Sequence, residues 1–201
     1  MRTIALVSGG KDSWYSLYLL LQQGFEIACT VTFSPKNPES YMLHSIKTHV
    51  VKKQSKLAGI RNYTISVSGE KEREVDEMKR WIAKIKEKEM AEALVSGAIR
   101  SDYQKCRIDM IAEELGLASY TPLWNKDEEK LLREITYSGF KFQIVAALAE
   151  GIEHWKDKII DENNVDLFIK DLKKSRANIS GEGGEYETLV VESPLFRLQS
   201  F

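Results

Sequence analysis

The sequence contains only two cysteines and four prolines, and it has no apolar run long enough to cross a membrane. Cys29 and Cys106 lie far apart and outside any CxxC or Cys/His pattern, which argues against a zinc site and against a secreted disulfide framework. The apolar runs at residues 17–21 and 144–149 fall well short of the roughly 20 residues that span a bilayer. The first apolar run ends at Val7 in a glycine loop, so no signal peptide is expected. We therefore expect a cytoplasmic protein without membrane contact.

An excess of charge of either sign is also missing, since 29 basic side chains stand against 30 acidic ones. No global field then favours nucleic acid or anionic lipid, and we expect no direct nucleic-acid partner. The 201 residues suffice for one domain, or for one domain with a modest appendage. The sequence leaves the oligomeric state open, a homo-oligomer included.

Short apolar runs alternate with segments of helical periodicity through the first 125 residues. Strands are expected at residues 4–7, 27–33, 63–67, 94–99 and 118–124, and helices at residues 13–23, 41–58, 75–85 and 101–116. This alternation predicts an α/β fold, in which a parallel sheet has helices on both faces and binds ligands beyond the carboxyl ends of its strands.

The pattern becomes less regular after a boundary placed near residue 125. A helix at 127–137, a strand at 141–146, a helix at 165–174 and a strand at 185–192 are expected there. The predicted domains are an α/β domain at residues 1–125 and a smaller C-terminal α+β portion at residues 126–201.

A loop of sequence SGGKDS joins the first predicted strand to the first predicted helix. Adjacent glycines let the backbone approach a ligand closely, so N–H groups can converge on phosphate at the positive end of the helix. Lys11 can neutralise phosphate charge, and Asp12 can hold the Mg²⁺ that accompanies a polyphosphate. The alternative is an ordinary glycine turn at a strand end. The nucleotide-binding residues predicted in this loop are Ser8, Gly9, Gly10, Lys11, Asp12 and Ser13.

The loop lacks the GxxxxGK[ST] pattern of a Walker A motif, and it resembles the SGGxDS signature of PP-loop ATP pyrophosphatases. That resemblance implies an adenine nucleotide alpha hydrolase-like, HUP-type fold. It also implies cleavage of ATP between the α and β phosphates, with ATP and Mg²⁺ as cofactors.

A second unusual segment, GEGGEYET at residues 181–188, places three carboxylates in a glycine-rich turn before a strand. Without other evidence, an acidic hairpin at the surface explains it equally well. However, SGGKDS, GAIRSDYQ at 97–104, PLW at 122–124 and GEGGEYET occur in the order typical of one family. From the N-terminus to Phe196 the chain resembles the diphthine-ammonia ligase (diphthamide synthetase) family. Its length resembles the short archaeal-type form, since eukaryotic members are expected to carry additional C-terminal domains.

This resemblance implies the ATP-dependent amidation of the diphthine carboxylate on translation elongation factor 2, with release of AMP and pyrophosphate. A carboxylate is a poor acyl donor, and adenylation would give it AMP as a leaving group. The sequence shows no glutaminase cysteine motif, so free ammonium is the expected nitrogen source. Two alternatives stay open: another PP-loop ATP pyrophosphatase acting on tRNA, and a nucleotide-binding protein that does not hydrolyse ATP.

The resemblance also assigns roles outside the loop. Ser101 and Gln104 could equally serve only to cap a helix instead of also contacting nucleotide or substrate. Trp124 could equally be a core residue instead of a site residue. An acidic turn folded over the loop could hold the quaternary ammonium of the substrate by charge and by aromatic faces, or hold the incoming ammonium. The predicted roles are as follows: catalysis by Lys11, Asp12, Glu185 and Glu187; nucleotide binding by Gly97, Ser101 and Arg107; substrate binding by His44, Tyr103, Gln104, Trp124, Glu182, Gly183, Gly184, Glu185 and Tyr186.

Overall fold

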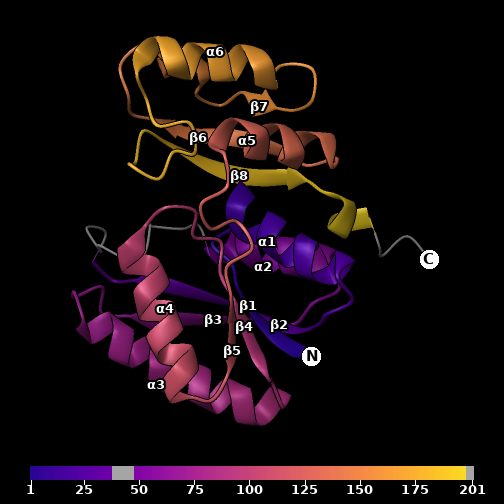
Figure 1. Cartoon of the computed structure of the whole chain (residues 1–201), viewed down its shortest axis with the longest axis vertical. Coiled ribbons are helices and arrows are strands. Elements are labelled where there is room, and N and C mark those ends of the chain that lie inside the picture. Colours follow the sequence, from indigo (N-terminus) through magenta and orange to yellow (C-terminus); the bar gives the residue numbers. More distant parts are fainter. Residues whose placement is uncertain (38–47, 198–201) are drawn as a thin grey trace.

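The computed structural model describes residues 1–37 and 48–197, and it stacks two layers of secondary structure along one axis (Figure 1). In the N-terminal layer, strands and helices alternate along the chain. They are β1 (Arg2–Leu6), α1 (Lys11–Gln22), β2 (Glu26–Pro35), α2 (Thr48–Leu57), β3 (Asn62–Val67), α3 (Arg73–Glu89), β4 (Ala93–Val95), α4 (Asp102–Glu114) and β5 (Ala118–Tyr120).

The five strands form one parallel sheet in the order β3-β2-β1-β4-β5. Helices α1 and α2 lie on one face, and α3 and α4 lie on the other (Figure 1). The predicted parallel sheet with helices on both faces is therefore confirmed. The strand order reverses between β1 and β4, which is where doubly wound sheets form a crevice for ligands.

The C-terminal layer is built around a small antiparallel sheet in the order β7-β6-β8, as the predicted α+β portion requires. Its elements are α5 (Glu128–Tyr137), β6 (Lys141–Ala147), η1 (Glu153–Trp155), β7 (Ile159–Ile160), α6 (Val165–Ser175), β8 (Tyr186–Glu192) and η2 (Pro194–Arg197). The β8 strand runs over the start of α1 (Figure 1).

A single hydrophobic core joins the two layers. Trp14 and Tyr15 of α1 are buried in the same cluster as Phe140, Phe142 and Phe168 of the C-terminal layer. The Tyr15 and Phe140 rings meet edge to face with centroids 5.6 Å apart. A second cluster fills the other face of the sheet, between the strands and α3 and α4. The boundary placed near residue 125 thus lies within one continuous structure, and it stays a prediction.

Two predicted strands end earlier in the structure. β4 stops at Val95, because the chain turns at Gly97 to pack against the loop after β1. β5 stops at Tyr120, and Trp124 lies in a turn whose backbone N–H donates to the carbonyl of Thr121 rather than at a strand end. The described part of the helix predicted at 41–58 is α2, and residues 41–47 of that prediction lie outside the described residues.

Candidate active site where loop and turn meet

The SGGKDS loop lies at the carboxyl edge of the sheet, beside the point where the strand order reverses. The Ser13 hydroxyl accepts from the backbone N–H of Ser8 at 3.1 Å and donates to the carbonyl of Gly10 at 3.1 Å. Both hydrogen bonds of the Ser13 hydroxyl lie within the loop and hold its shape, whereas the sequence predicts that Ser13 binds nucleotide.

The start of α1 has free capacity for an anion. Its N-cap, Gly10, supplies no side-chain cap, and the first-turn amides of a helix have no partner inside the helix. The N–H of Lys11 donates to Thr188 Oγ1 at 3.2 Å, so one of these amides is already satisfied by β8. The amides of Asp12 and Ser13 also lie at the positive end of the helix dipole, and the Asp12 amide interacts with the carboxylate of the same residue.

Asp12 has the free atom that a metal ligand needs. Its Oδ2 accepts from Lys11 Nζ at 2.9 Å, whereas Oδ1 is buried and has no hydrogen-bond partner among the described residues. A buried carboxylate oxygen without a partner is costly unless something binds it. Magnesium prefers such an oxygen together with the oxygens of phosphates, so Asp12 fits the ion predicted for it.

Lys11 points away from solvent, into the junction between the two layers. Only 3% of its side chain is exposed, and Nζ donates to Asp12 and to the carbonyl of Ser180 at 2.7 Å. Burial is the largest single influence and acts against its charge, but Asp12 and Tyr186 together outweigh burial, so the pKa of Lys11 lies above its ordinary value. For Asp12 burial is the larger influence and raises the pKa of the carboxyl, although Lys11 opposes it. In this structure Lys11 ties the loop to the C-terminal turn rather than presenting its charge to an open phosphate site.

Glycine is required in the loop by protein neighbours as well as by any ligand. A Cβ on Gly10 would lie 3.2 Å from Thr188 Oγ1, and one on Gly97 would lie 2.8 Å from the backbone N of Ser13. Gly9 combines a φ of +90° with Val51 and Gln54 close by. The glycines thus let β8, α2 and the end of β4 approach the loop backbone.

Gln54 of α2 is a site residue that the sequence reasoning missed. It is buried, and its Nε2 donates to the carbonyls of Gly9 at 3.1 Å and Val190 at 2.7 Å. Its Oε1 accepts from Trp14 Nε1 at 3.0 Å. A buried polar residue at a helical core position was the available signal, since such residues need partners.

The acidic turn lies against the loop, as the sequence predicts, and it is held by its own hydrogen bonds. Asn178 Oδ1 accepts from the backbone N–H groups of Ser180 at 2.9 Å and Gly181 at 3.0 Å. The Glu182 carboxylate accepts from the N–H groups of Ile99 at 2.7 Å and Arg100 at 2.6 Å, which follow β4. Glu182 therefore fastens the turn to the sheet edge, which differs from the substrate contact predicted for it.

Glu185 is less completely satisfied than Glu182. Its Oε1 accepts from the N–H of Asn178 at 3.3 Å, while Oε2 is buried without a partner among the described residues. The carboxylate lies over Gly183, where a Cβ would be 2.5 Å from Oε1, whereas Gly184 has open space on its Cβ side. Glu185 is the acid of the turn with an oxygen left for a ligand, while Glu187 of β8 has an interaction within the protein.

The tyrosine of the turn is a core residue in this structure. Tyr186 is 3% exposed, its hydroxyl donates to the carbonyl of Ile179 at 2.6 Å, and its ring packs edge to face on Phe168. Lys11 Nζ lies 5.1 Å from the ring centroid. Its face is thus already occupied by a cation of the protein, and it does not offer that face to a substrate cation. Tyr186 and Thr188 both contact Lys11, the ring through Nζ and the hydroxyl through the backbone N–H.

Other predicted residues lie on α4 or follow β5. Ser101 caps α4 by accepting from the N–H of Gln104 at 3.4 Å, and the nucleotide and substrate contacts of these two residues stay predictions. Arg107 forms a two-nitrogen ion pair with Glu72, at 3.0 and 2.6 Å, and it lowers the pKa of that carboxyl. The Arg107 guanidinium also lies 4.6 Å from the centroid of the Tyr103 ring.

These contacts engage the guanidinium of Arg107 with the start of α3 rather than with the loop. Lys105 Nζ lies 5.5 Å from the centroid of the Trp124 ring, so that ring also has a protein cation over it. His44 lies outside the described residues.

Residues 1–37 and 48–197 contain two cysteines and no cluster of metal-binding side chains. No group of three or more His, Cys, Asp or Glu side chains is placed there to hold a metal ion. Cys29 is buried, and burial raises the pKa of its thiol to about 12, while Cys106 is exposed on α4. None of the described helices is long and apolar enough to cross a membrane.

Two family models and the following relatives, which align over 98% of the chain, agree on one family. The model of the diphthamide synthase N-terminal domain matches residues 1–119, and that of the diphthamide synthase C-terminal domain matches residues 127–199. The mouse and human proteins named diphthine--ammonia ligase are each 30% identical over 218 residues, which cover 98% of this chain and 81% of theirs. The fission yeast protein of that name is 31% identical over 98% of this chain and 35% of its own length.

These lengths correct the expectation that eukaryotic members in general carry additional C-terminal domains. The fission yeast relative extends far beyond the shared region, but the mouse and human relatives do not.

A solved structure titled as a predicted subunit of a tRNA methyltransferase from Methanocaldococcus jannaschii aligns over 96% of this chain. Its identity is 17% and its TM-score is 0.46, which is too distant to assign a function.

Proposed function

The chain belongs to the diphthamide synthase family, and from this we propose that it is an ATP-dependent carbon-nitrogen ligase that converts the diphthine carboxylate to an amide. Ammonium supplies the nitrogen, and ATP is cleaved to AMP and pyrophosphate. We propose translation elongation factor 2 as the protein substrate, and hence a cytoplasmic location, where that factor works.

One observation carries the proposal: the loop and the acidic turn, 169 residues apart in sequence, meet through Lys11 and Ser180. Each brings one buried carboxylate oxygen, from Asp12 and from Glu185, that has no partner in residues 1–37 and 48–197. An acid in the first turn of α1 and a second acid in the turn that contacts Lys11 suit a site that takes a metal-polyphosphate on one side and a cation on the other.

The chain's own groups divide this work in the proposal. The amides of Asp12 and Ser13 bind departing pyrophosphate, and Asp12 Oδ1 holds Mg²⁺, which when bound neutralises phosphate charge. The turn covers the loop and excludes water from the activated carboxylate. Glu185 Oε2 holds the incoming ammonium or the substrate's quaternary ammonium, and it is the candidate acceptor of the proton that ammonium must lose.

The test is product analysis with diphthine-bearing elongation factor 2, with and without ammonium. We expect AMP and pyrophosphate in equal amounts, and amide formation that depends on ammonium. ADP and phosphate as products would reject the class of enzyme. Turnover with tRNA but not with the elongation factor would favour the tRNA alternative, and nucleotide binding without turnover would favour a non-hydrolysing protein.

A further inference from the structure

The edge strand β3 has unpaired backbone groups along its outer side. The N–H groups of Thr30 and Lys36 on β2 donate to the carbonyls of Arg61 and Val67, so the odd-numbered residues of β3 pair with β2. In a parallel ladder the residues between them point the other way. The N–H and C=O groups of Asn62, Thr64 and Ser66 therefore face outward, and none has a recorded partner in the described parts of the chain.

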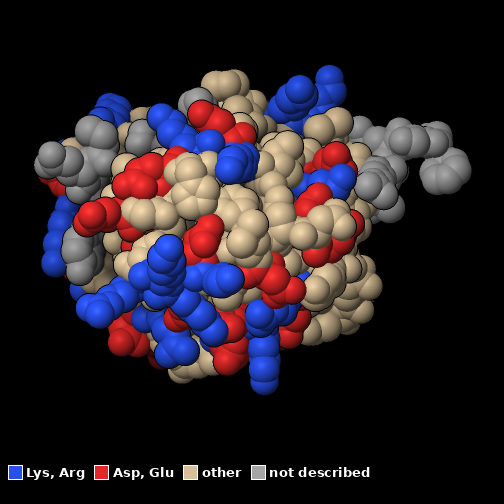
Figure 2. Space-filling model, turned by 90° about the horizontal axis from the view of Figure 1, so that it is seen from above, with Lys and Arg blue, Asp and Glu red and all other residues tan. Residues whose placement is uncertain are grey.

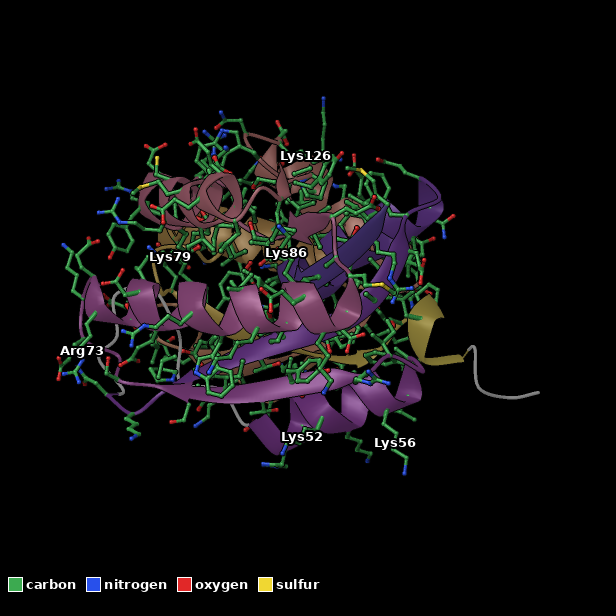
Figure 3. The ribbon with its side chains drawn as sticks, turned by 90° about the horizontal axis from the view of Figure 1, so that it is seen from below. Lys52, Lys56, Arg73, Lys79, Lys86 and Lys126 are labelled. Atoms are coloured by element: carbon green, nitrogen blue, oxygen red, sulfur yellow. The ribbon has the colours of Figure 1, made fainter. Side chains whose placement is uncertain are left out.

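Each end of this edge opens into a hollow. The hollow at the amino end has a volume of about 420 Å³ and is lined by Lys52, Lys56, Gly59, Ile60, Arg61 and Asn62. The hollow at the carboxyl end, of about 670 Å³, includes Ser66, Arg73 and the exposed ring of Trp81. Figure 3 shows the β3 edge between α3 and α2, with Lys52 and Lys56 projecting from α2 beside it. An extended segment along β3 would end in a hollow at both sides.

The amino-end hollow carries positive charge that the protein does not neutralise. Across the described residues Lys52 and Lys56 have no recorded ion pair, and of the three basic residues in the hollow only Arg61 has one, with Glu89 at 2.8 Å. Elsewhere the signs are mixed: acidic and basic side chains are interspersed over the face formed by the C-terminal layer (Figure 2). In a chain of net charge −1, a local excess of this kind favours an acidic partner.

We propose that an extended acidic segment of the protein substrate docks on β3 as an additional strand, with an acidic side chain in the hollow of Lys52 and Lys56. Main-chain bonds give affinity in strand addition, and pockets for side chains give specificity. The proposal rests on the proposed function for the identity of the partner.

The position of β3 suits a substrate that must reach the loop. All five strands are parallel, so β3 ends at the same edge as the loop, two strands from β1. At a strand spacing of about 4.8 Å, that is roughly 10 Å. A segment leaving the carboxyl end of β3 past Trp81 therefore emerges beside the candidate active site.

A second copy of the chain fits this edge less well. Antiparallel pairing of β3 with its own copy would bring the copy's carboxyl end to the basic hollow. The acids at that carboxyl end are Glu70 and Glu77, and they already pair with Arg73 at 2.9 and 3.6 Å. Lys52 and Lys56 would then stay without partners.

Proline at position 64 tests the strand addition. The Thr64 N–H faces outward, so proline removes a docking donor without breaking a bond to β2, and proline is tolerated on edge strands. We expect Thr64→Pro to raise the KM for diphthine-bearing elongation factor 2 about tenfold, with the KM for ATP and kcat unchanged. Thr64→Ala is the control, because it loses the same side chain but keeps the N–H.

The charge is tested by Lys56→Glu against Lys53→Glu. Both lysines are exposed on α2 and give the same change in net charge, but only Lys56 lines the hollow. We expect Lys56→Glu alone to raise that KM about fivefold or more at low salt, and the difference to shrink as salt is added.

Several outcomes would overturn the docking proposal. An active, folded Thr64→Pro enzyme with the KM of Thr64→Ala would reject it and leave the proposed function standing. A wild-type dimer that Thr64→Pro dissociates would show that the edge binds a second copy. Loss of RNA binding in Lys56→Glu, with protein binding intact, would assign the hollow to phosphate. A wild-type enzyme that does not amidate the factor would reject both proposals.

Discussion

The loop at residues 8–13 and the turn at residues 178–185 are both rich in glycine and lie against each other, but they use their polar groups differently. Within the described part of the chain, the loop leaves Asp12 Oδ1 without a partner, and its helix starts without a side-chain cap. The turn satisfies most of its groups internally, through Asn178 and through Glu182 on the amides after β4. The loop is therefore ready for a ligand, whereas the turn is mainly a clamp in which Glu185 is the exception.

The strongest test of this difference is Asp12→Ala. Loss of a metal ligand at a developing charge costs several kcal/mol, so we expect ATP turnover to fall about a thousandfold while the protein stays folded. Asp102→Ala is the matched control, since Asp102 is an exposed acid in the first turn of α4. Pyrophosphate release and circular dichroism give the two readouts. Near wild-type turnover in folded Asp12→Ala would remove the proposed role.

The same residue gives a dependence on pH. Burial raises the pKa of Asp12, so the folded protein takes up this proton at a higher pH than an ordinary aspartate does. A protonated Asp12 cannot hold Mg²⁺. We expect kcat/KM for ATP to fall with decreasing pH already above the ordinary range of an aspartate. Excess Mg²⁺ should move that fall to lower pH, because the ion competes with the proton.

Glu185→Gln asks whether the turn contributes to chemistry. If Glu185 holds ammonium or accepts its proton, the amide should reduce amidation about a hundredfold while the Kd for ATP stays unchanged. Glu187→Gln, two residues further along and within β8, is the control. Equal amidation by Glu185→Gln and wild type would show that the turn has a structural role only, as a clamp.

The sequence predicts the first layer well because its information is local. Each strand of this layer has its own apolar run, and the start of α4 has its own cap, in which Ser101 accepts from the N–H of Gln104. The closing of the site depends on contacts distant in sequence, such as Gln54 with Val190, and no local pattern reports them. For the same reason, Glu182, Tyr186 and Glu185 could be placed in the site from their motif, but the sequence did not tell which is the clamp, which the core residue and which the acid with an unpaired oxygen, in that order.

Glu182→Ala should mainly affect stability. Removing the carboxylate leaves two backbone N–H groups without acceptors, and we expect the free energy of unfolding to fall by about 1–3 kcal/mol. Hydrogen exchange at Ile99 and Arg100 should accelerate, which a general loss of packing would not select. Glu162→Ala, at an exposed position, is the control. Unchanged exchange at those two amides would contradict the clamp.

The smallest expected effect comes from Thr188→Val, and it separates the clamp from the ligand site most finely. The Thr188 hydroxyl accepts from the N–H of Lys11 at 3.2 Å, and a Cβ on Gly10 would lie 3.2 Å from the same oxygen. Valine keeps the shape but leaves that N–H without an acceptor, so we expect a loss of about 1 kcal/mol in unfolding free energy. Thr188→Ser keeps the hydroxyl and loses only a methyl group, so it should retain the hydrogen bond. If the amide serves only the clamp, the Kd for ATP should be equal in the two variants. If the Thr188→Val variant binds ATP more tightly than the Thr188→Ser variant, the freed N–H of Lys11 contributes to anion binding. In that case β8 competes with the nucleotide for the start of α1.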